Sequence, residues 1–313
     1  MLRADPVNAL PVEVAKELRD ALGRRQKELP PRWLAAHDAA VVRRARALRS
    51  HEFESAEREM SLAIIQQALA DLRPRAVVCV QPSASRVTRS LVEALRERGS
   101  VTTIAATELD GGLATGVLAE LSDATAGHAS IPLICDCSVE LSLPEQFPRP
   151  RVYLCLGNAI GSTTTVGAVR MLRVLRTSMS PGDALIVGVA IRADAAGSEV
   201  DLHDAERHMG AFNLVSSVTG AEVDLARFEF RRSFDSANNR HETLLVARKA
   251  LQLEVPGVCD VRFRKGESIR TSVSCAFDRN RVVAMMGGVG LTLREWQTDP
   301  SARFAVALAT PAV

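Results

Sequence analysis

Short apolar runs alternate with amphipathic segments through the middle of the chain. The apolar runs predict strands and the segments between them predict helices, in the order strand 76–80, helix 85–97, strand 101–106, helix 111–122, strand 131–135, strand 151–156, helix 166–179 and strand 184–189. Apolar strands of this length that are separated by helices are typical of a parallel sheet covered on both faces. The pattern therefore predicts a doubly wound α/β domain.

Helical spacing of apolar residues precedes this alternation. It predicts a first helix over 11–27, which ends at Leu29-Pro-Pro31 because proline cannot continue a helix. Two further helices are expected over 33–48 and 54–72. The N-terminal region therefore reads as helical.

After Ala190 the pattern changes. A helix is expected over 202–219, and two strand-like runs, 228–234 and 242–253, are joined by Ser236-Ala-Asn-Asn239, which is a hairpin signal. The chain then closes with three predicted elements, namely helix 281–287 and strands 292–296 and 304–309. We expect the last two strands to add an antiparallel hairpin to the parallel sheet.

Composition narrows the class of protein. The 313 residues are 47% hydrophobic with mean hydropathy +0.04, and no apolar run is long enough for a membrane span. The N-terminus lacks a signal pattern, so a cytoplasmic protein without a membrane partner is expected. The net charge is only +2 and the sequence contains no basic block, which argues against nucleic acid as a partner. Cys135-Asp-Cys137 is the only close cysteine pair, so no metal site is predicted.

The first strand-to-helix turn, Gln81-Pro-Ser-Ala-Ser85, contains no glycine. In a doubly wound domain a nucleotide-like cofactor normally lies against the backbone of this turn. Glycine lets the chain turn tightly and approach the ligand closely. The missing glycine therefore predicts impaired cofactor binding.

Several motifs carry a family resemblance along nearly the whole chain. They are Lys27-Glu-Leu-Pro-Pro-Arg-Trp33, Leu156-Gly-Asn-Ala-Ile-Gly161, Pro181-Gly-Asp-Ala-Leu-Ile-Val-Gly188, Gly210-Ala-Phe-Asn213, Gly266-Glu-Ser-Ile-Arg-Thr-Ser-Val-Ser-Cys275 and Trp296-Gln-Thr-Asp-Pro-Ser-Ala-Arg-Phe304. With these motifs the chain resembles the histidine-specific S-adenosylmethionine (SAM)-dependent methyltransferases, the histidine Nα-methyltransferases of ergothioneine biosynthesis.

The resemblance implies an α/β fold with a class I methyltransferase (Rossmann-like) sheet and a second, α+β substrate-type domain. The Rossmann-like domain is expected to combine residues 60–194 with 276–313. The substrate-type domain is expected to combine residues 1–59 with 195–275.

The resemblance also implies cofactor positions. The family's Glu-Leu-Gly-Ser-Gly aligns with Cys79-Val-Gln-Pro-Ser83, where Pro82 has no N–H to offer a cofactor. Glu108 could take the ribose hydroxyls in place of the family's aspartate. Asp136, displaced by one position, and Gly157 complete the cofactor-binding set that the resemblance implies. From the residues alone an exposed loop position is the favoured reading of each acid, and the glycine equally fits a tight turn.

On the substrate side the resemblance implies Asn158, Ser162, Phe212 and Ser274. Ser162 stands where the family has the asparagine that binds the acceptor carboxylate, and Ser272 stands where the family has the glutamate that binds the imidazole. Phe212 also suits a plain core position. With these contacts replaced, histidine is not expected as the acceptor.

Three functions remain open from the residues, and no catalytic residue is assigned. The first is a catalytically degenerate protein that acts as structural or regulatory partner of an active methyltransferase paralogue, in a hetero-oligomer or as a homodimer. The second is an active SAM-dependent N-methyltransferase for an amino acid or natural-product amine other than histidine. The third is a small-molecule binding module. SAM is expected as cofactor only if the protein is active.

Overall fold

The computed structural model describes residues 12–30, 33, 51–69, 72–82, 85–98, 101–109, 111–121, 127–192 and 202–312. It also leaves out the side chains of residues 51–53, 85, 111, 113 and 202–207. The chain divides into two compact units. The substrate-type unit comprises residues 1–45 and 194–274, and the sheet unit comprises residues 46–193 and 275–313.

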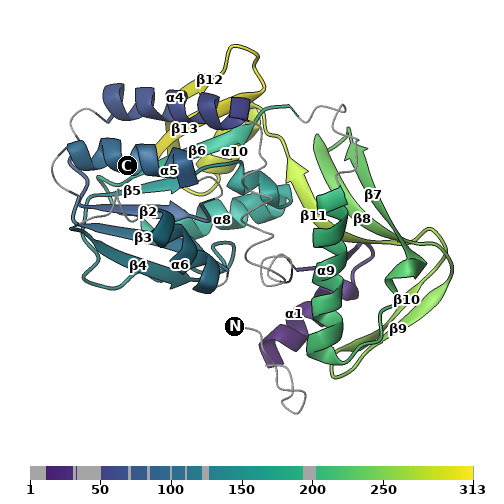
Figure 1. Ribbon diagram of the computed structural model, residues 1–313. Coiled ribbons are helices and arrows are strands. Elements are labelled where there is room, and N and C mark those ends of the chain that lie inside the picture. Colours follow the sequence, from purple (N-terminus) through teal and green to yellow (C-terminus); the bar gives the residue numbers. More distant parts are fainter. Residues whose placement is uncertain are drawn as a thin grey trace. The chain divides into compact units, whose positions relative to one another are not determined.

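The sheet unit contains a seven-stranded sheet in the order β12-β13-β6-β5-β2-β3-β4 (Figure 1). Its strands are β2 (Ala76–Val80), β3 (Thr103–Glu108), β4 (Ala129–Ile134), β5 (Arg151–Cys155), β6 (Ala184–Ala190), β12 (Leu291–Thr298) and β13 (Phe304–Pro311). Neighbouring strands from β4 to β6 are parallel, whereas β13 runs antiparallel to both β6 and β12. This arrangement confirms the predicted class I methyltransferase sheet with its closing hairpin.

Helices cover the sheet because each presents an apolar stripe to it. The helical elements of this unit are α4 (His51–Gln67), α5 (Ser85–Glu97), α6 (Gly111–Glu120), the 3-10 turn η1 (Ala159–Ser162), α8 (Thr165–Ser178) and α10 (Arg279–Gly287). In α5 the residues Val87, Leu91 and Leu95 recur at fourfold spacing and are buried. They share one core cluster with apolar residues of α4, α6 and the central strands. The central strands β2 and β5 are buried along their whole length, as expected for a parallel sheet.

Asp183 anchors the turn that leads into β6. Its Oδ1 accepts a hydrogen bond from the Arg151 backbone N–H (2.8 Å) and its Oδ2 accepts one from the Ser180 N–H (2.9 Å). The Arg149 guanidinium forms an ion pair with the same carboxylate, which is fully buried. The Pro181-Gly-Asp183 motif is therefore a structural turn that ties β5 to β6.

Asp299 holds the turn between β12 and β13 in the same way. Its Oδ1 accepts hydrogen bonds from the backbone N–H groups of Arg303 (2.8 Å) and Phe304 (2.6 Å). Its Oδ2 accepts hydrogen bonds from the backbone N–H and the hydroxyl of Ser301. Burial disfavours the charge of Asp299, but these hydrogen bonds outweigh it and hold the pKa of the carboxyl below its ordinary value.

The substrate-type unit combines a four-stranded sheet, ordered β1-β11-β8-β7, with a separate β9-β10 hairpin. Its elements are α1 (Val12–Leu22), β1 (Lys27–Glu28), α9 (Leu202–Thr219), η2 (Leu225–Arg227), β7 (Phe228–Asp235), β8 (Arg240–Ala247), β9 (Leu251–Val255), β10 (Cys259–Phe263) and β11 (Ser268–Cys275). One face of α9 packs on the strands through edge-to-face aromatic contacts. Phe212 lies 5.7 Å from Phe228, which lies 5.4 Å from Phe263.

Several predicted elements need correction. The single strand predicted over 242–253 is wrong, because β8 ends at Ala247 and β9 begins at Leu251. Strands β1, β10 and β11 were not predicted, since β1 has only two residues and β10 and β11 are rich in polar residues. The hairpin predicted at 236–239 is present between β7 and β8. The helix predicted over 33–48 lies outside the described residues except for Trp33.

The first domain boundary differs from the expected one. Helix α4 runs without a break from His51, so residues 51–59 belong to the sheet unit and not to the substrate-type unit.

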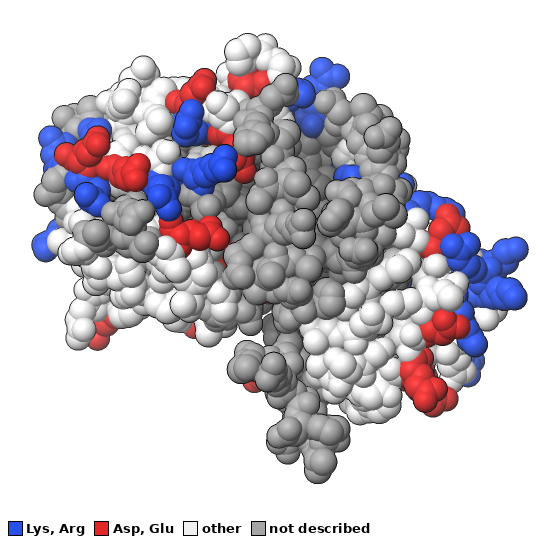
Figure 2. Space-filling view, viewed as in Figure 1, with Lys and Arg blue, Asp and Glu red and all other residues white. Residues whose placement is uncertain are grey.

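On the face shown in Figure 2, Lys and Arg side chains are interspersed with Asp and Glu side chains among the described residues.

Candidate active site

The candidate site lies at the carboxyl ends of the parallel strands of the sheet unit. Strand β2 has β3 on one side and β5 on the other, so the connections run in opposite directions from this point. Open α/β sheets bind ligands outside the carboxyl ends of their strands at such a switch point. The turns after β2, β3, β4 and β5 are therefore the segments that would meet a cofactor.

The turn after β2 keeps a left-handed backbone without glycine. Gln81 has φ 44°, a conformation that residues other than glycine rarely adopt. Its N–H donates to both the carbonyl oxygen and the hydroxyl of Thr107, each at 3.1 Å. These bonds offset a backbone cost of about 1 kcal/mol or more. The absence of glycine has therefore not removed the left-handed conformation at Gln81, while Ser83 and Ala84 of the same turn lie outside the described residues.

Glu108 is the last residue of β3 and is 1% exposed. Its carbonyl oxygen accepts a hydrogen bond from the Cys135 N–H (2.9 Å), which aligns the ends of β3 and β4. A carboxylate at the end of the second strand is placed where Rossmann-type domains bind ribose hydroxyls. Glu108 therefore lies at the strand end that its predicted role requires, and the role itself stays a prediction.

The loop after β4 contains Asp136 between two cysteines. The Asp136 Oδ1 accepts hydrogen bonds from the Ser138 N–H (2.8 Å) and hydroxyl (2.6 Å), so its own loop fixes the carboxylate. The Sγ atoms of Cys135 and Cys137 lie 3.6 Å apart. Asp136 is only partly buried, and its cofactor role stays a prediction.

The turn after β5 has two consecutive left-handed residues, Gly157 (φ 65°) and Asn158 (φ 57°). The Asn158 side-chain amide joins two other segments, since its Nδ2 donates to the Cys275 carbonyl oxygen (3.1 Å) and its Oδ1 accepts from the Ala190 N–H (3.1 Å). A Cβ at Gly161 would collide with that amide and with the Cys275 carbonyl. The glycines of this motif thus make room for a bridge made by Asn158.

Glu57 of α4 was missed by the sequence reasoning. It is 1% exposed, and its Oε1 accepts a hydrogen bond from the Gly157 N–H (2.6 Å). Gly188 leaves the space that this carboxylate fills, because a Cβ there would overlap with it. The available signal was its helical spacing with buried Met60, Ser61 and Ile64, which places an acid on the inward face of α4.

The predicted substrate-binding residues are distributed over both units. In the sheet unit, Ser162 is exposed and donates its hydroxyl to the Ala159 carbonyl oxygen (2.6 Å). In the substrate-type unit, Phe212 is 1% exposed within the core, and Ser274 is exposed near the end of β11. Core packing accounts for Phe212, and the substrate roles of all three stay predictions.

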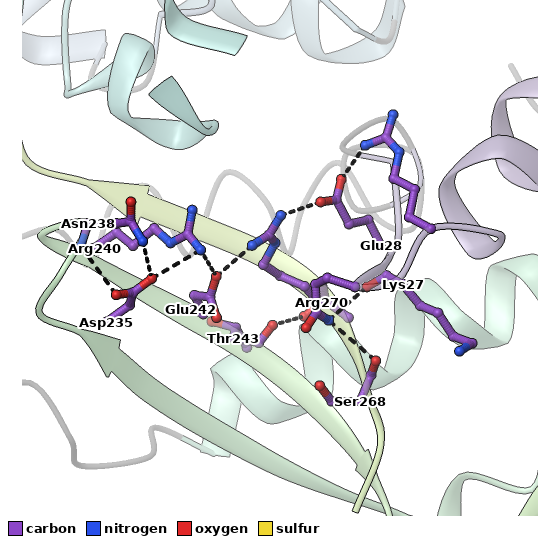
Figure 3. A network of polar contacts seen from close by, with 12 residues as sticks. Lys27, Glu28, Asp235, Asn238, Arg240, Glu242, Thr243, Ser268 and Arg270 are labelled. Atoms are coloured by element: carbon purple, nitrogen blue, oxygen red, sulfur yellow. Dashed lines mark hydrogen bonds and ion pairs between the residues drawn. The ribbon is translucent and has the colours of Figure 1, made fainter. Parts of the chain in front are cut away.

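Strand β11 also carries a network of charges in the substrate-type unit (Figure 3). The Arg270 guanidinium bridges Glu28 of β1 and Glu242 of β8, with 2.5 Å to the latter. Arg240 extends the network from Glu242 (2.8 Å) to Asp235 (3.1 Å). Because strand residues two apart share a face, Ser272 and Ser274 continue along the face of Arg270.

The described residues hold no group of three or more His, Cys, Asp or Glu side chains that could bind a metal ion. Within the same part of the chain, no helix is long and apolar enough to cross a membrane.

Comparisons with known proteins show what the chain is similar to. A family model described as histidine-specific methyltransferase, SAM-dependent, matches residues 14–311. The histidine N-alpha-methyltransferase of Mycolicibacterium smegmatis is 28% identical over 308 residues, and that of Mycobacterium tuberculosis is 27% identical over 304 residues. Each alignment covers 94% of this chain and 94% of the relative. A solved SAM-dependent methyltransferase from Clostridium acetobutylicum matches with a TM-score of 0.48 and 10% identity, over 86% of this chain and 95% of that one.

Proposed function

Because the chain belongs to the histidine-specific, SAM-dependent methyltransferase family, we propose that it transfers a methyl group from SAM to the α-amino group of histidine. The observation that carries this proposal is the family match across residues 14–311. The acceptor follows the printed name of the two relatives, which align over 94% of the chain.

Family membership corrects the functional prediction made from the sequence. The expectation of a degenerate, non-catalytic protein is wrong, and so is its alternative of an acceptor other than histidine, because the family and both named relatives are histidine methyltransferases. The error came from treating the glycine-free turn as a lost turn. The left-handed Gln81 supports the corrected reading, because the backbone there has the conformation that glycine would supply.

The described residues fit SAM as a cofactor. Glu108 would accept hydrogen bonds from the ribose hydroxyls, since it is a buried carboxylate at the end of β3. The left-handed turns at Gln81 and Gly157 would let the backbone come close to the cofactor. Glu57 would act as a positioning residue, because its carboxylate holds the Gly157 N–H.

SAM, when bound, supplies an activated methyl group on a positively charged sulfur. Methyl transfer then depends mainly on holding donor and acceptor in line, and little covalent chemistry is needed from side chains. The hydrogen-bonded residues Gln81 and Gly157 in the turns after β2 and β5 would contribute to this positioning from the protein side. Such a reaction requires no metal and no covalent intermediate on the protein.

In the substrate-type unit, a serine hydroxyl would contact the acceptor where this chain departs from the family. Ser272 stands at the imidazole-binding position, and Ser274, which the family also has, lies on the same face of β11. A hydroxyl both donates and accepts, so it can bind a carboxylate or a neutral imidazole. The carboxylates nearby in the same sheet, Glu28 and Glu242, are both paired with Arg270.

The proposal is tested by incubating the purified chain with SAM and histidine and detecting S-adenosylhomocysteine and methylated histidine by mass spectrometry. We expect product with histidine and none with imidazole propionate, which lacks the amine. Absence of any histidine methylation by a chain that binds SAM would overturn the proposed acceptor.

Glu108→Gln tests the cofactor site separately. Loss of a charged hydrogen-bonding partner is worth about 1.5–3 kcal/mol, so the Kd for SAM should rise about tenfold to a hundredfold. Glu140→Gln is the matched control, because Glu140 is an exposed acid in the loop after β4. Equal SAM affinity in the two variants would show that Glu108 does not bind the cofactor.

A further inference from the structure

The loop after β4 brings two thiols close together. Cys79 and Cys155 are completely enclosed in strands, and Cys275 is 2% exposed. Cys135 is partly exposed, and its Sγ lies 3.6 Å from the Sγ of Cys137. The sequence analysis attached no chemistry to this pair, and the proposed methyl transfer does not use it.

We propose that Cys135 and Cys137 form a thiol–disulfide modification site that responds to peroxide. A disulfide needs an S–S distance of about 2.05 Å, so the two sulfurs must approach by roughly 1.5 Å. Both thiols lie in the segment after β4, where residues 135 and 136 belong to no helix or strand and 137–139 form a turn. The approach therefore requires no strand of the sheet to break.

The surroundings assign different roles to the two sulfurs. The hydrogen bond with Cys137 lowers the pKa of Cys135, against the opposing effects of burial and of the Asp136 and Glu108 charges. The hydrogen bond with Cys135, together with burial, raises the pKa of Cys137. Cys135, which is also the more exposed, is thus the attacking thiolate, and Cys137 is the resolving thiol.

The chemistry is balanced with peroxide as the oxidant. The Cys135 thiolate attacks one peroxide oxygen, the O–O bond breaks, and after proton uptake one water leaves while Cys135 becomes a sulfenic acid. The Cys137 sulfur then attacks the Cys135 sulfur, the S–O bond breaks, and a second water leaves. Two thiols are oxidised to one disulfide, and one peroxide is reduced to two waters.

The modification site is physically connected to the turn after β2. The Cys137 Sγ lies in hydrogen-bonding contact with the Thr107 hydroxyl (3.3 Å), and that hydroxyl accepts the N–H of left-handed Gln81 (3.1 Å). A disulfide draws the Cys137 sulfur toward Cys135 and removes its thiol proton, so this contact with Thr107 is weakened. We therefore expect oxidation to loosen the Gln81 turn and, resting on the proposed function, to weaken SAM binding.

The modification is tested first without the cofactor. The full-length chain is treated with increasing hydrogen peroxide, alkylated, digested, and mapped by mass spectrometry. We expect a Cys135–Cys137 disulfide that a dithiol reductant reverses, and Cys135→Ser should abolish it. Cys259→Ser, which removes a partly exposed cysteine of β10, should leave it unchanged. Recovery of both thiols in reduced form, or of over-oxidised Cys135 beside a free Cys137, would overturn the proposal.

The coupling to the turn is tested on the same samples. Losing one hydrogen bond should speed hydrogen exchange of the Gln81 amide, and raise the Kd for SAM, by about threefold to tenfold. Cys137→Ser keeps a hydroxyl that can bond to Thr107, so this variant should bind SAM with the Kd of the parent chain. Peroxide treatment should change neither its Kd nor its Gln81 exchange rate. Unchanged exchange and affinity in the disulfide form would overturn the coupling. Failure of the reduced chain to bind SAM would instead count against the proposed function, while the disulfide mapping and exchange data still decide this inference.

Discussion

Replacing Asn158 tests the bridge that its side chain makes between three segments of the sheet unit. Asn158→Ala removes the hydrogen bonds to the Ala190 N–H and the Cys275 carbonyl oxygen, each at 3.1 Å. Each bond contributes about 0.5–1.5 kcal/mol, and a left-handed alanine costs about 1 kcal/mol more than an asparagine. We expect the free energy of unfolding of the sheet unit to fall by about 2–4 kcal/mol.

Two further variants separate these contributions. Asn158→Gly also removes both hydrogen bonds but tolerates the φ of 57°, so it should be about 1 kcal/mol less destabilising than alanine. Asn158→Asp keeps an acceptor for the Ala190 N–H but places a second oxygen against the Cys275 carbonyl oxygen. It should therefore be at least as destabilising as alanine at neutral pH.

The assay is urea unfolding monitored by the fluorescence of Trp296, which lies in β12 of the sheet unit. The chain has only two tryptophans, and a Trp33→Phe background removes the other, which lies in the substrate-type unit. If Asn158→Ala changed the unfolding free energy by less than 1 kcal/mol, or if glycine were worse than alanine, the bridge would not have the role inferred here.

Three other substitutions test the turns of the sheet unit. Gly161→Ala should destabilise the sheet unit by about 2 kcal/mol or more in the same urea assay, because the new methyl group collides with the Asn158 side-chain amide. The control is Gly287→Ala at the end of α10, where the new methyl group meets no other atom. It should be neutral or stabilise the unit by up to about 1 kcal/mol. Asp183→Asn should cost about 2–4 kcal/mol in urea unfolding, since it removes a buried charge that pairs with an arginine and accepts two backbone N–H groups. An equal effect of Glu145→Gln, which changes an exposed acid of the same unit, would contradict this. Because the pKa of Asp299 is lower in the folded than in the unfolded state, its carboxylate stabilises the fold fully above the unfolded pKa of about 4, and this stabilisation is lost as pH falls through the folded pKa. Asp299→Asn should therefore flatten the fall in unfolding free energy below about pH 4. An unchanged pH profile of stability would refute this.

Much of the sheet unit was predictable from local pattern. Runs such as Ala76–Val80 and Ala184–Ala190 are apolar throughout because both of their faces are covered, and that signal is strong without tertiary information. The substrate-type unit was predicted less well. Its strand Ser268–Cys275 mixes buried Ile269 with Arg270, Thr271 and serines, so it carries no clear alternation of apolar and polar residues.

The site was predictable in position but not in backbone conformation. Glu108 could be placed because the strand it ends was recognisable. The left-handed Gln81 could not, because two hydrogen bonds to Thr107 on a neighbouring strand stabilise it, and such partners are invisible in a local sequence window. Glu57 was not identified from the sequence for a related reason. Several acids occur in α4, and only the packing of the helix shows which of them accepts the Gly157 N–H.

The Asn158 bridge also bears on how variable the substrate-type unit can be. Ala190 and Cys275 flank the long segment that contributes most of that unit, and the Phe277 N–H donates to the Ala190 carbonyl oxygen (2.8 Å) beside the bridge. Together these bonds close a loop of about eighty residues, and loop-closure entropy grows only with the logarithm of length, by about 0.6 kcal/mol per doubling. Insertions or deletions within that segment therefore change the closure entropy of the sheet unit very little. Such changes of length need not destabilise the point where the segment is attached.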